Sequence, residues 1–430
     1  MDLSPALVLS AAFVALLAFG VPISHATGLA SIAALLTLMP PLPAVSVTAQ
    51  RIATGLDSFA LLAIPFFFMA GSIMNRGGIA RRLIDCAKVF VGWMPGPLAQ
   101  ITVLANMMFG CVSGSAVAAA SAIGGTMQPS MDKAGYDRSY SAAVNISSCI
   151  TGLLIPPSGA FIVYSLVSGG TSVAALFVAG YLPGILLGVA VMVPAWIMAK
   201  RRGYAPLPAL TLPESTRAVL SAIPSLGLIV VVIGGIVGGV FTATEGSAIA
   251  VVYALALALA YRELKAVDLY HILVDTMEAT AVVALMVGTS MAMAYVMSLA
   301  EIPQIIGEWV RAVSGNWIVA LLLINVVMGT FLDITPGILI FTPIFLPVLV
   351  ELGVDPVHFG VILVFNLCLG IVSPPTGSAL FIGCAIAKVS IEQVTRPLIP
   401  LFAASTLALL LVTYLPGLSL WLPRLFGLME

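Results

Sequence analysis

The sequence predicts an all-α polytopic membrane protein built from two inverted repeats. Hydrophobic residues make up 61% of the 430 residues and charged residues only 8%, with a mean hydropathy of +1.15. Uncharged apolar runs of about 18 or more residues recur along the whole chain, as expected for helices that cross a bilayer. Rare residues also recur at one constant spacing, so motifs of the first half reappear in the second. A soluble domain is incompatible with this composition.

Ten apolar stretches are long enough to be predicted as membrane spans. The first, within residues 7–24, follows no Lys or Arg, so it is expected to be a true span and not a signal peptide. The predicted spans lie at 6–24, 26–44, 59–75, 141–168, 173–199, 218–241, 244–262, 270–300, 357–388 and 395–416.

Two further apolar stretches, 94–130 and 316–350, are each interrupted by a small polar cluster. The first contains Ser113-Gly114-Ser115 and the second Asp333-Ile334-Thr335-Pro336. Both are predicted to be re-entrant helical hairpins, because irregular backbone at membrane depth is tolerated only where protein or a wet cavity covers it.

The distribution of positive charge supports these hairpins. With the N-terminus outside, 14 of the 17 Lys and Arg residues fall in inner loops, and only Arg51, Arg311 and Arg424 lie outside. Reading either hairpin as a full crossing would destroy this asymmetry, which membrane proteins normally show.

The constant spacing divides the chain into two halves, 1–215 and 216–430. It aligns Asp137 with Asp355, Gly152 with Gly370, and Pro156-Pro157 with Pro374-Pro375. Each half contains five spans and one hairpin, and because five is odd the second half enters the membrane inverted. Inverted repeats with paired broken helices are typical of secondary transporters, whose site lies at the repeat interface.

The two proline pairs indicate where ions would bind. Proline has no N–H, so the carbonyl four residues earlier loses its helical donor. The carbonyls of Gly152 and Leu153, and of Gly370 and Ile371, are therefore predicted to be free. A hard cation such as Na⁺ would satisfy such oxygens in an apolar interior.

The segments after the breaks and at the hairpin tips favour an anion. Ser158 and Thr376 lie where new half-helices begin, and a helix N-terminus presents free N–H groups. Ser113 and Ser115 are predicted to cap the returning half of the first hairpin. Thr335 is predicted as the N-cap of the second, with Pro336 in the first helical position. No Lys or Arg falls in the predicted core, so a substrate carboxylate would rely on helix N-termini, hydroxyls and Na⁺.

Several alternatives remain open at this point. Asp333 is a functional candidate because an ionisable side chain at membrane depth is costly, although it can also simply cap a helix. Asn145 and Asn366 can bind a cation or only brace helices. The five cysteines indicate neither a disulfide framework nor a zinc site. A net charge of −1 does not favour nucleic acid, and no catalytic motif is present, so no enzymatic activity and no organic cofactor are expected.

Several stretches resemble a known family. They include GCVSGSAVAAASAIGG (110–125), LIPPSGAFIVYS (154–165) and GVDPVHFGVILVFNLCLGIVSPPTGSALF (353–381). They are similar to the large membrane subunit of TRAP transporters, the tripartite ATP-independent periplasmic transporters. The resemblance implies Na⁺-coupled uptake of an organic acid anion across the bacterial inner membrane. In that membrane, the charge distribution predicts a periplasmic N-terminus. The resemblance also implies two partners, a periplasmic substrate-binding protein and a small four-helix membrane subunit.

The resemblance further implies an elevator-type fold, in which a transport domain with both hairpins moves against a scaffold. The expected substrate-binding residues are Ser113, Ser115, Ser158, Asp333, Thr335 and Thr376. The expected Na⁺ ligands are Ser113, Gly114, Ser115, Asn145, Gly152, Leu153, Asp333, Thr335, Asn366, Gly370 and Ile371. A stand-alone sodium/anion symporter and a non-transporting membrane subunit stay open as alternatives. Dicarboxylates, sugar acids and sialic acid all fit such an oxygen-rich site.

Overall fold

The computed structural model describes residues 4–206, 211–313, 319, 321, 324–325, 333–374 and 377–429, and these residues form helices joined by short turns. The helices of the first half are α1 (Ser4–Ala18), α2 (Ile23–Leu35), α3 (Pro41–Leu56), η1 (Phe59–Leu62), α4 (Ala63–Arg76), α5 (Ile79–Val91), α6 (Pro97–Ser113), α7 (Ala116–Lys133), α8 (Arg138–Cys149), α9 (Thr151–Leu154), α10 (Gly159–Val167) and α11 (Val173–Arg201).

The second half contains α12 (Leu212–Val237), α13 (Ala243–Ala260), α14 (Ala266–Leu299), α15 (Ile302–Val313), α17 (Ile334–Glu351), α18 (Pro356–Gly370), α19 (Ser378–Ala387), α20 (Ile391–Tyr414) and α21 (Gly417–Leu425). Within the described residues, seven helices are long and apolar enough to cross a membrane, or eight if the bent segment from Arg138 to Val167 is one span. The prediction of an all-helical polytopic membrane protein is confirmed.

Several elements of the second half begin where the spacing that aligns Asp137 with Asp355 places them. Helix α7 begins at Ala116 and α17 at Ile334; α8 and α18 begin at Arg138 and Pro356; α11 and α20 begin at Val173 and Ile391. The turns that precede α8 and α18 match in detail. Gly135 and Gly353 have φ of +73° and +83°, and Asp137 and Asp355 are the N-caps of the two helices. The repeat in sequence is therefore also a repeat of backbone structure.

The first two predicted spans are longer than the helices found. Helix α1 has 15 residues and α2 has 13, and α2 ends at Leu35, well before the expected end at 44. Prolines at positions 40, 41 and 43 separate α2 from α3, because proline is favoured only in the first turn of a helix. Helices α3, α5, α15 and α21 were not predicted as elements. Of the expected hairpin at 316–350, the first arm lies largely outside the described residues.

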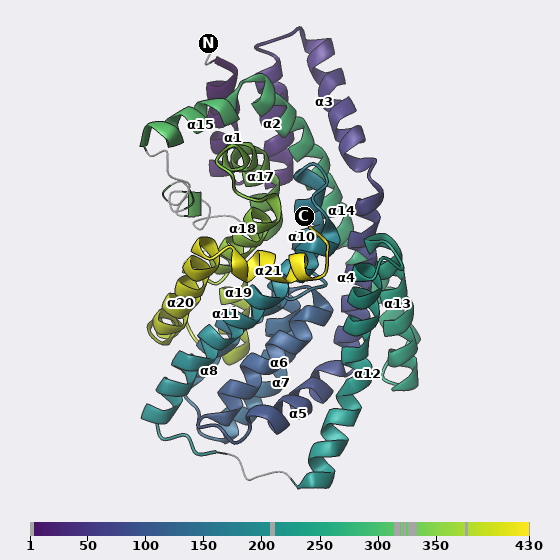
Figure 1. Cartoon of the computed structure of the whole chain (residues 1–430), viewed down its shortest axis with the longest axis vertical. Coiled ribbons are helices and arrows are strands. Elements are labelled where there is room, and N and C mark those ends of the chain that lie inside the picture. The colour runs from purple at the N-terminus through teal and green to yellow at the C-terminus, as the bar shows by residue number, and fades with distance from the viewer. Residues whose placement is uncertain are drawn as a thin grey trace.

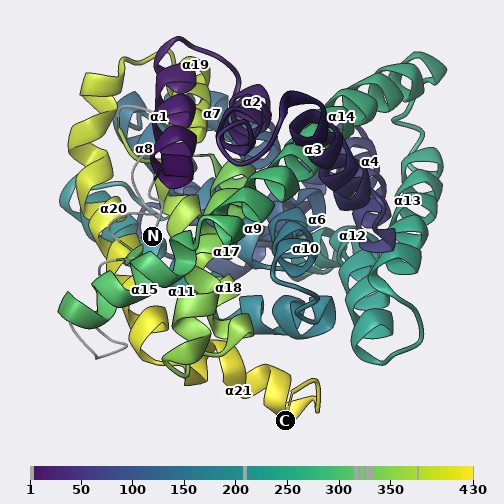
Figure 2. The same cartoon turned by 90° about the horizontal axis from the view of Figure 1, so that it is seen from above.

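The α9–α10 break and helix α17 of the second hairpin lie in the middle of the molecule. Seen from above, α9, α10 and α17 lie centrally, with α12 and α13 on one side and α8 and α20 on the other (Figure 2). Along the long axis, α1, α2, α3 and α15 gather at one end, and α5, α8 and the start of α12 reach toward the other (Figure 1). Helices of the first half pack against helices of the second half at the centre of the molecule. Helix α10 packs against α17 and α18, while α19 packs against α7 and α8.

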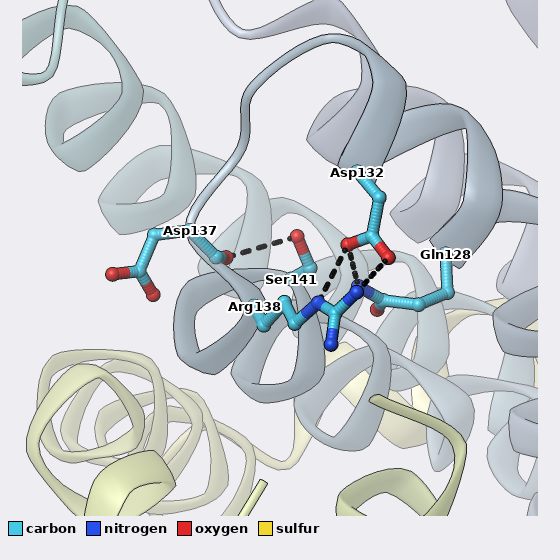
Figure 3. A network of polar contacts seen from close by, with 5 residues as sticks. All are labelled: Gln128, Asp132, Asp137, Arg138 and Ser141. Atoms are coloured by element: carbon cyan, nitrogen blue, oxygen red, sulfur yellow. Dashed lines mark hydrogen bonds and ion pairs between the residues drawn. The ribbon is translucent and has the colours of Figure 1, made fainter. Parts of the chain in front are cut away.

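A polar network fixes the turn between the first hairpin and the first broken span (Figure 3). Arg138 donates to both carboxylate oxygens of Asp132, at 3.3 and 2.9 Å, and Gln128 donates to Asp132 at 2.9 Å. Burial raises the pKa of Asp132, but the hydrogen bonds from Gln128 and Arg138 and the charge of Arg138 lower it more, so the pKa lies below its ordinary value. One residue pair thus links the end of α7 to the start of α8.

Candidate functional site

The hairpin tips and the helix breaks meet at one cavity of about 230 Å³. Two of its walls come from the first half, at the α6–α7 tip and the α9–α10 break. Two come from the second half, at the start of α17 and on either side of the α18–α19 break. Helices α4 and α14 close it. The lining residues are Ile64, Phe68, Gly114, Ser115, Ala116, Val117, Leu153, Gly159, Ala160, Val163, Val283, Asp333, Ile334, Thr335, Ile371 and Ser378.

The first hairpin reverses direction at Gly114. Its φ of +62° lies in the left-handed region, which glycine adopts without steric cost, and it ends α6. Ser115 is then the N-cap of α7, because its Oγ accepts a hydrogen bond from the Ala118 N–H at 3.3 Å. The predicted cap at Ser115 is confirmed. The same prediction for Ser113 is wrong, since Ser113 is the last residue of α6 and its hydroxyl points to the Ser115 carbonyl at 3.5 Å.

This tip is packed directly onto the first break. A Cβ on Gly152 would lie 2.1 Å from the Gly110 Cα, so the two backbones touch with no side chain between them. A Cβ on Gly71 of α4 would lie 2.6 Å from the Ser113 carbonyl oxygen. Ser113 and Gly114 also line a narrow crevice of about 10 Å³ with Pro157 and Gly159. The glycines therefore allow the first hairpin tip and the first helix break to pack in direct backbone contact.

The first break bends the span by 49° between α9 and α10. Leu153 lines the cavity, whereas Gly152 lies behind it against α6. Ser158 precedes α10 in an extended conformation, and its side chain is fully buried. The Ser158 Oγ has no hydrogen-bond partner among the described residues, and Ser158 is not part of the cavity lining.

The second tip confirms the alternative left open for Asp333, namely that this residue caps a helix. Asp333 is the N-cap of α17, with an extended backbone, and its Oδ1 accepts from the Ile334 N–H at 2.8 Å. The predicted cap at Thr335 is wrong because Thr335 is already helical, which places Pro336 in the third helical position. Asp333 and Thr335 both line the cavity, and the Asp333 side chain is exposed to it.

At the second break, the carbonyls predicted to be free have partners. Gly370 accepts from the Ser373 N–H at 3.2 Å and from its hydroxyl at 2.8 Å, and Ile371 accepts from the Ala379 N–H at 3.1 Å. The chain after α18 folds back and replaces the missing helical donors. Ile371 still lines the cavity, Gly370 does not, and Thr376 lies outside the described residues.

Two pairs of asparagine side chains brace the hairpins. The sequence analysis identified only one residue of each pair, Asn145 and Asn366. Asn106 of α6 donates to the Asn145 Oδ1 at 3.0 Å, and Asn145 donates to the Ala120 carbonyl at 3.0 Å. Asn366 of α18 donates to the carbonyl of Asn325 at 2.8 Å and to its Oδ1 at 2.6 Å. Neither Asn145 nor Asn366 lines the cavity. The sequence signal for the missed partners was an asparagine inside the apolar first arm of each hairpin, Asn106 in the first and Asn325 in the second.

The electrostatic character of the cavity follows from the four helices that begin at it. Helices α7, α10, α17 and α19 start at Ala116, Gly159, Ile334 and Ser378, and all four residues are in its lining. A helix N-terminus carries roughly half a positive charge. Among the described lining residues, Asp333 alone is charged, and it sits at one of these termini. The cavity thus combines several N–H-rich helix starts with a single carboxylate.

The chain is similar to known membrane transporters over nearly its whole length. The family model of the tripartite ATP-independent periplasmic transporter, DctM component, matches residues 10–418. The chain is 52% identical to YgiK of Salmonella typhimurium (strain LT2), covering 98% of each chain. It is 38% identical to the sialic acid TRAP transporter large permease protein SiaM of Vibrio cholerae, over 89% of this chain and 90% of that protein.

A solved structure supports the fold alone. The YdaH transporter of Alcanivorax borkumensis superposes with a TM-score of 0.63 at 13% identity, covering 91% of this chain and 90% of the other. The predicted family is confirmed by the matches in sequence. The chain belongs to the tripartite ATP-independent periplasmic transporter family, as a DctM component, the large permease of a binding-protein-dependent transporter.

Proposed function

We propose that this permease couples the entry of Na⁺ to the import of an organic acid anion. The observation that carries the proposal is the convergence of four helix N-termini on one cavity whose described lining contains a single carboxylate, that of Asp333. Helix N-termini stabilise an anion through oriented N–H groups. A carboxylate and exposed hydroxyls suit a hard cation.

In this proposal the first hairpin tip binds the anion and the second hairpin tip binds Na⁺, because the two tips differ in charge at equivalent positions. Ser115 and Asp333 are equivalent in the repeat, and each is the N-cap of the returning arm of its hairpin. The neutral Ser115 leaves the positive end of α7 uncompensated, which favours the substrate carboxylate. Asp333 compensates the end of α17 and adds a negative charge, which favours Na⁺.

The transport cycle is proposed to be an elevator movement of the hairpins and broken helices against a scaffold. The residues of α4 and α14 that close the cavity are Ile64, Phe68 and Val283, all apolar. A wall of this kind makes no hydrogen bonds that would have to break when the opposite surface slides past it. The two inverted halves, and a periplasmic N-terminus in the inner membrane, belong to the same proposal.

The proposal includes two partners, a small four-helix membrane subunit and a periplasmic binding protein that delivers the anion. The relative SiaM is named for sialic acid, which carries a carboxylate. The same carboxylate chemistry extends the substrate class to dicarboxylates and other sugar acids.

Uptake by the reconstituted complex tests the function. The permease, the small subunit and the binding protein are placed in proteoliposomes, and accumulation of a radiolabelled organic acid is followed with an inward Na⁺ gradient or with choline instead. Accumulation above the equilibrium level should occur only with Na⁺. Equal accumulation with choline would overturn the coupling.

A further inference from the structure

A second polar cavity lies away from the transport site, between α5 and α12. It has a volume of about 310 Å³ and is lined by Asp85, Lys88, Glu214, Arg217, Ala218 and Ser221. Helix α5 lies beside the lower part of α12 (Figure 1), and the two helices are in contact. None of these residues takes part in the transport site described above.

The position of this cavity along α12 corresponds to the edge of the apolar membrane interior. Arg217 is followed by 218–237, which contain no charged residue. Leu220 and Ile223, on the next two turns, are 61% and 52% exposed, as expected for side chains that face lipid. Two residues after the end of α5, Trp93 is 72% exposed, and tryptophan is enriched at the membrane–water interface. The cavity therefore lies at the depth of lipid headgroups.

The charges in the cavity are balanced and incompletely paired. Lys88 forms an ion pair with Asp85 at 2.6 Å. Glu214 accepts from the N–H and hydroxyl of Thr211, at 2.9 and 2.7 Å, in the capping box that starts α12. Arg217 makes no side-chain hydrogen bond or ion pair with any residue that the structure describes. Two positive and two negative side chains thus face one space, with one guanidinium available.

We infer that this cavity binds the headgroup of phosphatidylethanolamine. The Arg217 guanidinium and the Lys88 ammonium hold the phosphate, since guanidinium groups match phosphate oxygens in geometry. The carboxylates of Glu214 and Asp85 accept hydrogen bonds from the primary ammonium of the headgroup. The acyl chains follow the apolar face of α12 at Leu220 and Ile223. A choline headgroup has no N–H to donate, and a glycerol headgroup has no positive charge, so both bind less tightly.

Native mass spectrometry of the full chain in detergent tests the inference without any variant. Phosphatidylethanolamine, phosphatidylcholine and phosphatidylglycerol with identical acyl chains are added in turn, and the retained lipid is measured at rising collision energy. The ethanolamine lipid should be retained most. Equal retention of all three lipids, or preference for phosphatidylglycerol, would overturn the inference.

Variants locate the lipid. Arg217→Gln should weaken ethanolamine-lipid retention about tenfold, and Glu214→Gln should reduce its preference over choline lipid while keeping the capping box. Arg201→Gln, an exposed arginine at the end of α11, is the matched control and should change nothing. Undiminished retention in both cavity variants would overturn the site. Displacement of the lipid by an equal concentration of free phosphoethanolamine would show a soluble ligand instead, and would also overturn it.

Discussion

Tyr140 and His358 make the same contact in the two halves of the chain. The Tyr140 hydroxyl donates to the carbonyl of Ala195 at 2.8 Å, and the His358 Nε2 lies 3.2 Å from the carbonyl of Thr413. A carbonyl only accepts, so Nε2 carries the proton. The two donors occupy equivalent positions in the repeat, and so do the two acceptors. Each contact joins the start of a broken span to the last long helix of its half, α11 or α20, so the repeat extends to individual hydrogen bonds.

Removing one of these contacts should destabilise the fold locally. Tyr140→Phe keeps the ring and deletes the donor, and the expected loss is about 1 kcal/mol, the usual net contribution of one hydrogen bond. Tyr270→Phe is the control because Tyr270 is 66% exposed. Thermal unfolding in detergent measures both variants. The same melting temperature for Tyr140→Phe and wild type would show that the contact contributes nothing.

Asp333→Asn separates the charge of Asp333 from its capping role. Asparagine caps a helix about as well as aspartate, so α17 should remain intact. Loss of the charge should weaken the apparent Na⁺ affinity of uptake by about tenfold, which corresponds to about 1.4 kcal/mol. The measurement is the Na⁺ dependence of the initial uptake rate in proteoliposomes.

Asp355→Asn is the matched control for Asp333→Asn. Asp355 is the N-cap of α18, with its Oδ1 2.8 Å from the Val357 N–H, and it does not line the transport cavity. Its replacement should leave the Na⁺ dependence unchanged. An equal loss in both variants would mean that capping, and not a charge in the cavity, sets the Na⁺ affinity.

Ser115→Ala should weaken both helix α7 and the binding of the anion. The Ser115 Oγ accepts from the Ala118 N–H, and loss of an N-cap costs about 1 kcal/mol. Because Ser115 lines the cavity, the apparent affinity for the organic acid should also fall severalfold. Concentration-dependent uptake measures this change, with Ser172→Ala, the N-cap of α11, as a capping control outside the cavity. Unchanged affinity would remove the Ser115 hydroxyl from the site.

Gly152→Ala should disrupt the packing of the first hairpin against the first helix break. The added Cβ would lie 2.1 Å from the Gly110 Cα, which forces the backbones apart and costs roughly 1–3 kcal/mol. Gly125→Ala in α7 is the control, since its Cβ would meet nothing within 4 Å. That variant should be neutral or stabilising, because alanine is the better helix former. Yield and melting temperature should therefore fall for Gly152→Ala and not for Gly125→Ala.

Because of the Asp132–Arg138 ion pair, we expect the stability of the protein to fall at acidic pH. The pKa of Asp132 in the folded protein is lowered, so its contribution to stability is present above the ordinary aspartate pKa of about 3.9 and is lost as the pH falls through the lower folded value. Replacing Asp132 with asparagine should lower the free energy of unfolding by about 0.5 kcal/mol at pH 7, since the pair is partly exposed, and by less at pH 2. Unfolding of the variant and wild type at both pH values checks the sign.

The sequence predicted the broken elements well because their signals are local. Two adjacent prolines remove two N–H donors whatever surrounds them, and Gly114 ends α6 through its own backbone freedom. It predicted the cap at Ser115, but for the second tip it favoured Thr335 and kept Asp333 only as an alternative. Asp and Thr are both good N-caps, and only the backbone shows that α17 begins after Asp333. The short α1 and α2 were overextended because apolar composition does not mark where a helix stops.

By itself, the sequence determined that the chain crosses a membrane repeatedly, where its helices break, and that its elements recur at one constant spacing. Composition, proline chemistry and residue spacing carry that information along the chain. Tertiary structure alone decided that both tips and both breaks line one cavity, and that the carbonyls of Gly370 and Ile371 find new donors. These outcomes depend on close packing between distant segments, such as Gly110 against Gly152, and no local signal reports which backbones will touch.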